Sequence, residues 1–149
     1  MTDEELLARA IAEARQGLSE GGIPIGAALA HNGLVLGSGH NRRVQQNSVI
    51  RHGETDCLEN VGRLPARVYA ESTIATTLSP CDMCTGAILL YGIPRVVVGE
   101  HKNFYGGEDL LRTRGVEVVV LDSAECVELM ETFIAEHPAL WHEDIGEER

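Results

Sequence analysis

Apolar side chains recur along the first twenty residues with the spacing of an α-helix. Thr2, with Glu5 three positions later, has the pattern of a capping box, in which each residue binds a backbone N–H of the other. Two consecutive glycines, Gly21 and Gly22, favour the end of a helix. The pattern therefore predicts one amphipathic helix between these signals. Its apolar face would consist of Leu6, Leu7, Ala10, Ile11, Ala14 and Leu18.

The pattern then changes to two short apolar runs, residues 25–31 and 34–39, on either side of Asn32-Gly33. An Asn-Gly pair between two such runs predicts a β-hairpin. After the hairpin, strand patterns alternate with helix patterns, which predicts a three-layer α/β/α sandwich around a five-stranded mixed sheet. The later strands are expected at 72–78, 95–99 and 116–121, and the later helices at 52–61, 80–91, 108–114 and 123–136.

Nothing in the sequence divides this arrangement, because no repeat, linker or low-complexity segment interrupts it. We therefore predict a single domain over residues 1–149, ending in an irregular tail, 138–149, after Pro138 stops the last helix. The stretch 86–91 is apolar nearly all round, so it must be buried on several sides. We expect it to contribute to a homodimer contact.

Composition narrows the possible partners. The chain is 44% hydrophobic and 23% charged, as in ordinary globular proteins, and its net charge is −11. Such a charge repels phosphate backbones and argues against a nucleic-acid partner. No basic segment precedes an apolar run at the N-terminus, and no run of 18 apolar residues exists. These features predict a cytoplasmic protein, without a membrane anchor, whose four cysteines stay reduced.

Two motifs, HGE from residue 52 and PCDMC from residue 80, carry the candidate chemistry. Together they match the H-x-E and P-C-x-x-C signature of zinc deaminases. Cys81 and Cys84 are three positions apart at the start of a predicted helix, so both sulfurs face one side. The helix N-terminus favours their thiolates, which bind zinc. With His52 they make three protein ligands, and a fourth open position is typical of a catalytic zinc.

Glu54 lies two residues after the predicted ligand His52 and is not needed as a ligand. A zinc ion lowers the pKa of a bound water to around 7. A carboxylate at this position is suited to take a proton from water and deliver it to a ring nitrogen, then to a departing amine. The motifs therefore predict hydrolytic deamination of an amidine-like carbon.

The motifs have other interpretations when taken singly. A C-x-x-C pair alone could be a redox pair or half of a structural zinc site, which would need a fourth Cys or His. Cys57 lies one turn after His52 and is interpreted as a buried core residue, as is Cys126. The remaining histidines have no ligand spacing and are expected at the surface or in loops: His31, His40, His101, His137 and His142.

Over nearly its whole length the sequence resembles the fungal-type cytosine deaminases of the cytidine deaminase superfamily. The resemblance rests on GGIPIGAAL from residue 21, GHNRR from 39, HGE from 52, LENVGRL from 58, the 25 residues from Thr76 to Glu100, and EDIGE near the end. It implies a homodimer with one zinc per subunit, held by His52, Cys81 and Cys84. It also implies that Glu54 carries protons.

The resemblance further implies that Asn41 and Asp144 bind the base with their side chains, and Gly53 and Ser79 with their backbones. The residues walling or covering the pocket would be Ile25, Thr76, Leu78, Phe104, Trp141 and Ile145. An Asn amide offers a donor and an acceptor in one plane, whereas Asp accepts only and suits a ring N–H. Taken alone, Asn41 could shape a turn, Trp141 could be core, and Asp144 could be a solvated carboxylate.

The predicted function is hydrolysis of free cytosine to uracil and ammonia, with the tail covering the active site and excluding nucleosides. The main alternative is deamination of another small ring, such as isocytosine, creatinine, an s-triazine or guanine. Two further alternatives are a tRNA adenosine deaminase, which usually carries H-A-E, and a non-catalytic zinc module. Arg51, residues 55–57 and residues 44–50 depart from the fungal pattern, which bears on the substrate range.

Overall fold

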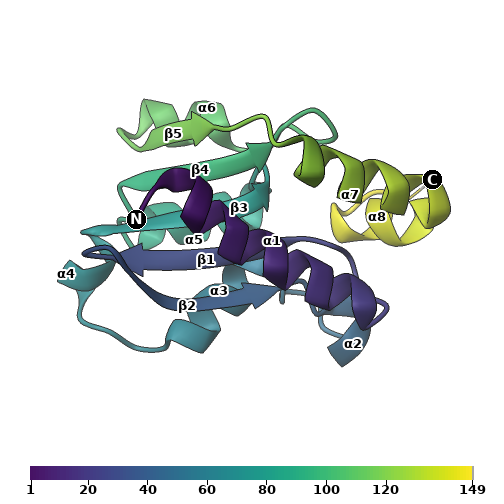
Figure 1. Ribbon diagram of the computed structural model, residues 1–149, viewed down its shortest axis with the longest axis horizontal. Helices are drawn as coiled ribbons and strands as arrows, with labels where there is room; N and C mark the ends of the chain where they lie inside the picture. The colour runs from purple at the N-terminus through teal and green to yellow at the C-terminus, as the bar shows by residue number, and fades with distance from the viewer. Residues whose placement is uncertain (149) are drawn as a thin grey trace.

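Five strands form one mixed sheet at the centre of the computed structural model, which describes residues 1–148 (Figure 1). The order across the sheet is β2-β1-β3-β4-β5. β1 runs antiparallel to β2 and β3, whereas β3, β4 and β5 are parallel. The predicted five-stranded mixed sheet is therefore confirmed. The strands are β1 Gly26–His31, β2 Leu34–His40, β3 Ser72–Leu78, β4 Arg95–Glu100 and β5 Glu117–Val120.

Helices cover both faces of the sheet, which confirms the predicted sandwich (Figure 1). The first helix has the predicted capping box, because Thr2 Oγ1 accepts from the Glu5 N–H at 3.1 Å and the Glu5 carboxylate accepts from the Thr2 N–H at 2.8 Å. The helices are α1 Asp3–Ser19, α2 Arg43–Gln46, α3 Gly53–Val61, α4 Ala66–Tyr69, α5 Asp82–Leu90, α6 Glu108–Thr113, α7 Ala124–Glu136 and α8 Pro138–Asp144.

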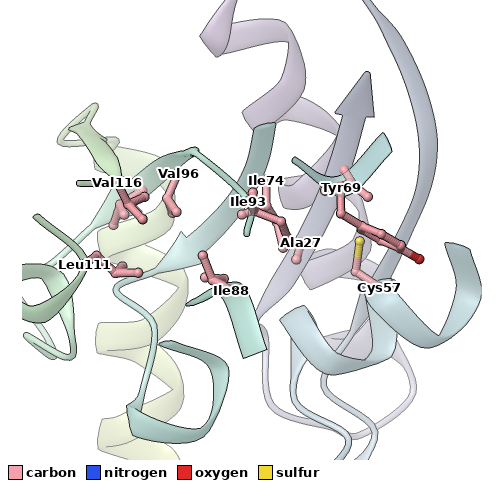
Figure 2. Close-up of a cluster of buried hydrophobic side chains, with 11 residues drawn as sticks. Ala27, Cys57, Tyr69, Ile74, Ile88, Ile93, Val96, Leu111 and Val116 are labelled. Carbon is pink, nitrogen blue, oxygen red and sulfur yellow. The ribbon is translucent and has the colours of Figure 1, made fainter. Parts of the chain in front are cut away.

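Alternation along the strands divides the core into two layers. One layer lies between the sheet and α3, α5 and α6. In Figure 2 its side chains extend from Val96, Leu111 and Val116 on one side, past Ile74, Ile88 and Ile93, to Cys57 and Tyr69 on the other. The other layer lies under α1 and α7 and contains the small side chains Ala28, Ala30 and Ala75. These small residues let α1 approach closely. At Gly26 a Cβ would lie 2.1 Å from the carbonyl oxygen of Ala10.

A third apolar cluster lies where β3 and β4 end, beneath α7 and α8 (Figure 1). Here the expectation of an irregular tail is wrong, because residues 138–144 form a helix. Pro138 predicts the end of a helix, and α7 does end at Glu136. Pro138 then occupies the first turn of the next helix, where its fixed φ fits and its missing N–H costs nothing. Trp141 and Asp144 are consequently buried on α8. The last residue of the predicted domain and tail, Arg149, lies outside the described residues.

His40 does not lie at the surface as predicted. It ends β2 with 1% exposure, and its ring nitrogens lie 2.6 Å from Glu13 on α1 and 2.8 Å from Glu20, the residue that caps α1. The other four histidines outside the motif are at least partly exposed. Cys57 and Cys126 are buried core residues, as predicted. Within residues 1–148, no helix has the length and apolar character needed to cross a membrane.

Candidate active site

Three potential metal ligands converge where α3 and α5 begin. His52 is the N-cap of α3 and Cys81 is the N-cap of α5, so both lie at helix starts as predicted. The ligand atoms of His52, Cys81 and Cys84 lie within 4.8 Å of one another. The imidazole Nδ1 of His52 lies 3.4 Å from Cys81 Sγ. Two sulfurs and one imidazole are a donor set that fits zinc. Among the described residues, no fourth His, Cys, Asp or Glu belongs to this group.

The two thiols interact strongly with each other. The hydrogen bond with Cys84 lowers the pKa of Cys81 to about 4, against the effect of burial and with help from His52. The same hydrogen bond, together with burial, raises the pKa of Cys84 well above its usual range. Cys81 is therefore the sulfur poised as a thiolate, the form that binds metal. Binding of a metal by both sulfurs then requires Cys84 to release its proton.

Glu54 lies next to this ligand set, in the first turn of α3. Its side chain is 4% exposed and lines a small cavity together with His52 and Cys81. Burial, and then the negative charge of Cys81, raise the pKa of Glu54 to about 7. A carboxyl group with a pKa near neutrality both accepts and donates protons readily under physiological conditions. Glu54 is thus a titratable carboxyl group beside the predicted metal ligands, where the predicted proton transfer would take place.

The side chains of Asn41 and Asp144, which are 103 residues apart in the sequence, are in contact with each other next to His52. Asn41 Nδ2 donates to Asp144 Oδ1 at 2.8 Å, and the same oxygen lies 3.3 Å from His52 Nε2. Both side chains are buried, so the interpretation of Asp144 as a solvated carboxylate is wrong. Burial raises the pKa of Asp144, against the opposing effects of His52, Asn41 and Arg43. The last residue of α8 is thereby tied to the metal-binding region.

The cavity between these groups is narrow, with a volume of about 20 Å³. The rings of Phe104 and Trp141 meet edge to face across 5.8 Å at 84°, and so do not form a parallel slot for a planar ring. Most residues predicted to contact or wall a pocket do line the cavity. The lining consists of Ile25, His52, Glu54, Leu78, Ser79, Cys81, Phe104, Trp141, Asp144 and Ile145.

Three predicted substrate-binding residues lie beside the cavity without lining it. Asn41 is joined to it through Asp144. Gly53 brings the start of α3 against β1, because a Cβ there would lie 3.1 Å from the carbonyl oxygen of Ile25. Thr76 is fully buried, and its hydroxyl donates to the carbonyl oxygen of Leu78 at 3.0 Å. Thr76 therefore shapes the end of β3 in this structure.

Two buried carboxylates that sequence reasoning missed hold the loop that carries Phe104. Glu108 accepts the hydroxyl of Ser79 at 2.7 Å, and the same hydroxyl accepts the Gly106 N–H at 2.9 Å. Glu100 accepts the backbone N–H groups of residues 102 and 103 at 2.7 and 2.9 Å. An acidic residue that ends a buried strand was the available signal for Glu100.

Comparison with known proteins bears on this site. Residues 1–100 match a family model described as the zinc-binding region of cytidine and deoxycytidylate deaminases. The chain is 56% identical over 146 residues to a cytosine deaminase of Candida albicans, covering 97% of each protein. It is 33% identical to a tRNA-specific adenosine deaminase of Streptococcus pyogenes, covering 83% of this chain and 84% of that one.

Solved structures with the same fold include deaminases of two kinds. One, from a study of tRNA:A34 deaminases, has a TM-score of 0.71 and 26% identity, covering 85% of this chain and 99% of that one. A guanine deaminase from Nitrosomonas europaea has a TM-score of 0.70 and 22% identity, covering 90% of this chain and 85% of that one. At that identity the second likeness shows the fold alone.

Proposed function

The chain belongs to the family of cytidine and deoxycytidylate deaminases, and we propose that it is a zinc-dependent enzyme that hydrolyses free cytosine to uracil and ammonia. The observation that carries this proposal is one narrow cavity lined by two of the zinc ligands, Glu54 and Asp144. The identity of 56% to a cytosine deaminase over almost the full chain supports the substrate.

The proposed mechanism needs one metal and one proton carrier. When bound by His52, Cys81 and Cys84, zinc supplies a Lewis acid that makes hydroxide available near neutral pH. Glu54 takes a proton from the attacking water and delivers it to ring N3 as the water oxygen bonds to C4 of cytosine. Glu54 then carries the second water proton to the exocyclic nitrogen. The C4–N bond breaks, ammonia leaves, and C4 becomes the carbonyl carbon of uracil.

Asn41 and Asp144 are proposed to recognise the edge of the ring opposite the reacting amine. The backbone N–H of Arg43 donates to Asn41 Oδ1 at 3.1 Å, which fixes the amide with its NH₂ group toward Asp144. The pair thereby offers a donor and an acceptor side by side, complementary to the O2 and N1–H of cytosine. Ile25, Leu78 and Phe104 would contact the flat faces of the ring.

The same pair explains why a free base is proposed. In a nucleoside, N1 carries the sugar and has no hydrogen to donate. Asp144 would keep its contact with Asn41 but lose the ring N–H, and the sugar would collide with the buried carboxylate, at a cost of several kcal/mol, roughly a thousandfold in selectivity. The −11 charge and the position of α8 over the cavity likewise oppose a tRNA substrate. The other small ring compounds named above remain the alternative substrates.

The experiment that tests the substrate is ammonia release by the zinc-loaded protein from a panel of cytosine, cytidine, isocytosine, creatinine, an s-triazine and guanine. We expect cytosine to have the highest kcat/KM and to yield uracil and ammonia in equal amounts. Cytidine should react about a thousandfold more slowly. A higher kcat/KM for any other ring, or equal turnover of cytosine and cytidine, would overturn the proposal.

The assembly and setting are also proposals. Helix α5 buries Ile88 but leaves Leu90 75% exposed, and Tyr91, which caps the helix, is 48% exposed beside a groove of about 710 Å³ between α3, α4 and α5. An apolar patch of this kind supports a homodimer through α5.

We place the enzyme in the cytoplasm, in pyrimidine salvage. Residues 138–149 are proposed to act as a lid, because a cavity of about 20 Å³ must widen to admit a pyrimidine.

A further inference from the structure

Asp56, which departs from the fungal pattern, is a buried carboxylate that the proposed mechanism does not use. It lies on α3 with 0% exposure, two residues after Glu54. Arg51 donates to Asp56 Oδ1 from Nε at 2.8 Å and lies at 2.7 Å through its terminal nitrogen. Arg42 donates from Nε to Oδ2 at 2.9 Å. One carboxylate thus holds two arginines, one on each oxygen.

The two arginines adjoin Asn41 and His52, which are among the side chains that contact Asp144. Arg42 directly follows Asn41, and Arg51 directly precedes His52. The backbone N–H of Arg42 also donates to the carbonyl oxygen of Arg51 at 2.9 Å, so the two segments are paired. We propose that Asp56, Arg42 and Arg51 form a positioning clamp, which fixes the base-binding Asn41 relative to the zinc ligand His52. This inference rests on the function proposed above.

Close packing ties the clamp to the sheet. Asp56 Oδ2 also accepts the backbone N–H of His40 at 3.0 Å and the side chain of Asn60 at 3.4 Å. At Gly39 a Cβ would lie 2.7 Å from Asp56 Oδ2 and 2.4 Å from the Cys57 nitrogen. The end of β2 and the start of α3 are therefore in direct contact at the carboxylate. A shift of Asp56 would move both segments.

The clamp reaches the cavity through a short chain of contacts. The backbone N–H of Asn41, which directly follows β2, donates to the carbonyl oxygen of Ile25 at 2.9 Å, and its side chain donates to Asp144 of α8. The position of the end of β2 therefore determines where Asn41 contacts Asp144. Glu54 lies on α3, whereas Arg42 lies on the segment that follows β2. Glu54 should therefore keep its position if the Arg42 side chain is lost. Loss of the Arg42 contact should therefore affect binding of the base more than proton transfer.

Stability alone does not explain an ionic cluster at this place. Replacing buried ion pairs by apolar residues of similar volume is often neutral or stabilising. The side chains of Arg42 and Arg51 are only 27% and 30% exposed, so this cluster is largely removed from water. Charge-assisted hydrogen bonds also fix the relative orientation of the groups that they join. Here they fix Arg42 and Arg51, which adjoin Asn41 and His52 next to the cavity.

The test uses two variants of the full zinc-loaded chain, Arg42→Gln and Arg51→Gln, in which Asp56 keeps one arginine partner. For Arg42→Gln we expect the KM for cytosine to rise at least about tenfold while kcat stays within about threefold, the signature of lost uniform binding. For Arg51→Gln we expect zinc transfer to a chelator to accelerate at least about tenfold, as for other residues that orient a metal ligand. Asp56→Asn should show both effects.

The matched control is Asp3→Asn, which breaks the similarly paired Asp3–Arg95 contact at 2.6 and 2.7 Å, formed at the opposite end of β4. It should change neither KM nor the rate of zinc transfer. The clamp is refuted if both arginine variants stay within about twofold of the wild type in KM and in zinc transfer. If the wild-type chain releases no ammonia from cytosine, the proposed function fails. The rate of zinc transfer from Arg51→Gln then decides the clamp by itself.

Discussion

At the scale of single residues, the proposed reaction depends most directly on Glu54. Glu54→Gln keeps the size of the side chain but removes the group that accepts and returns protons. We expect zinc content and fold to be unchanged and kcat to fall by at least about 10²–10⁴. The measurement is ammonia release with parallel metal analysis. Glu59→Gln, on the exposed face of the same helix, is the control. A zinc-loaded Glu54→Gln enzyme with a near-normal rate would show that Glu54 has another role.

Glu20 offers a second test, through the dependence of stability on pH. Hydrogen bonds from Gln16 and then from the buried His40 lower the pKa of Glu20 to about 2. A depressed pKa stabilises the fold at pH values above the unfolded pKa, near 4.5, and this contribution disappears as the pH falls toward 2.

Thermal melting of Glu20→Gln measures this effect. Because the Glu20 side chain is 31% exposed, we expect a Tm decrease of only about 2–4 °C at pH 6. The difference from the wild type should shrink progressively below pH 4.5. Glu4→Gln, on the exposed side of α1, should show no such pH dependence. A difference that stays constant down to pH 2 would contradict the assignment.

How far the site could be predicted depends on the reach of each residue's contacts. The zinc ligands and Glu54 were predictable because ligand spacing at two helix starts is a local pattern. Asn41 and Asp144 required a family resemblance, since their contact spans 103 residues. Asp56 and Glu108 were not predictable, because a carboxylate is buried only when partners from several segments satisfy it.

At the scale of secondary-structure elements, periodicity predicted the long helices and all five strands. The single-turn helices α2 and α4 have too few residues to establish a period. The helix α8 was missed because proline both ends one helix and begins another. That error matters for function, since α8 holds Asp144 buried at the cavity instead of in a loose tail.

Asp144→Asn tests the proposed role of α8 in binding the base. The substitution preserves shape but replaces a charged acceptor with a neutral amide. We expect kcat/KM for cytosine to fall roughly 10–100-fold, the value of a hydrogen bond to a charged group. The ratio of kcat/KM for cytosine to kcat/KM for cytidine should decrease. Glu136→Gln, an exposed carboxylate at the end of α7, is the control. Unchanged kinetics in Asp144→Asn would remove this residue from the base-binding site.

At the scale of the whole molecule, the net charge of −11 opposes self-association, whereas the apolar surface of α5 favours it. Charge repels copies at long range, whereas a desolvated apolar patch binds them at contact. We expect a homodimer at micromolar concentration in sedimentation or light scattering. Leu90→Glu should produce monomers, because it places a charge within the apolar patch.

The control for the dimer is Leu34→Glu, which changes a residue 69% exposed on the edge strand β2. It should leave the dimer intact. A wild-type chain that is monomeric at micromolar concentration, or a dimer equally sensitive to both substitutions, would contradict the assignment of α5 as the interface.

A zinc ion held by His52, Cys81 and Cys84 is proposed to make this chain a cytosine deaminase. The most direct measurement removes the metal with a chelator and returns zinc stepwise while uracil and ammonia are measured. We expect no turnover in the metal-free protein and a linear rise in rate that ends at one zinc per chain. Uracil formation that is independent of zinc, or a fully loaded and folded chain that releases no ammonia from cytosine, would contradict this proposal.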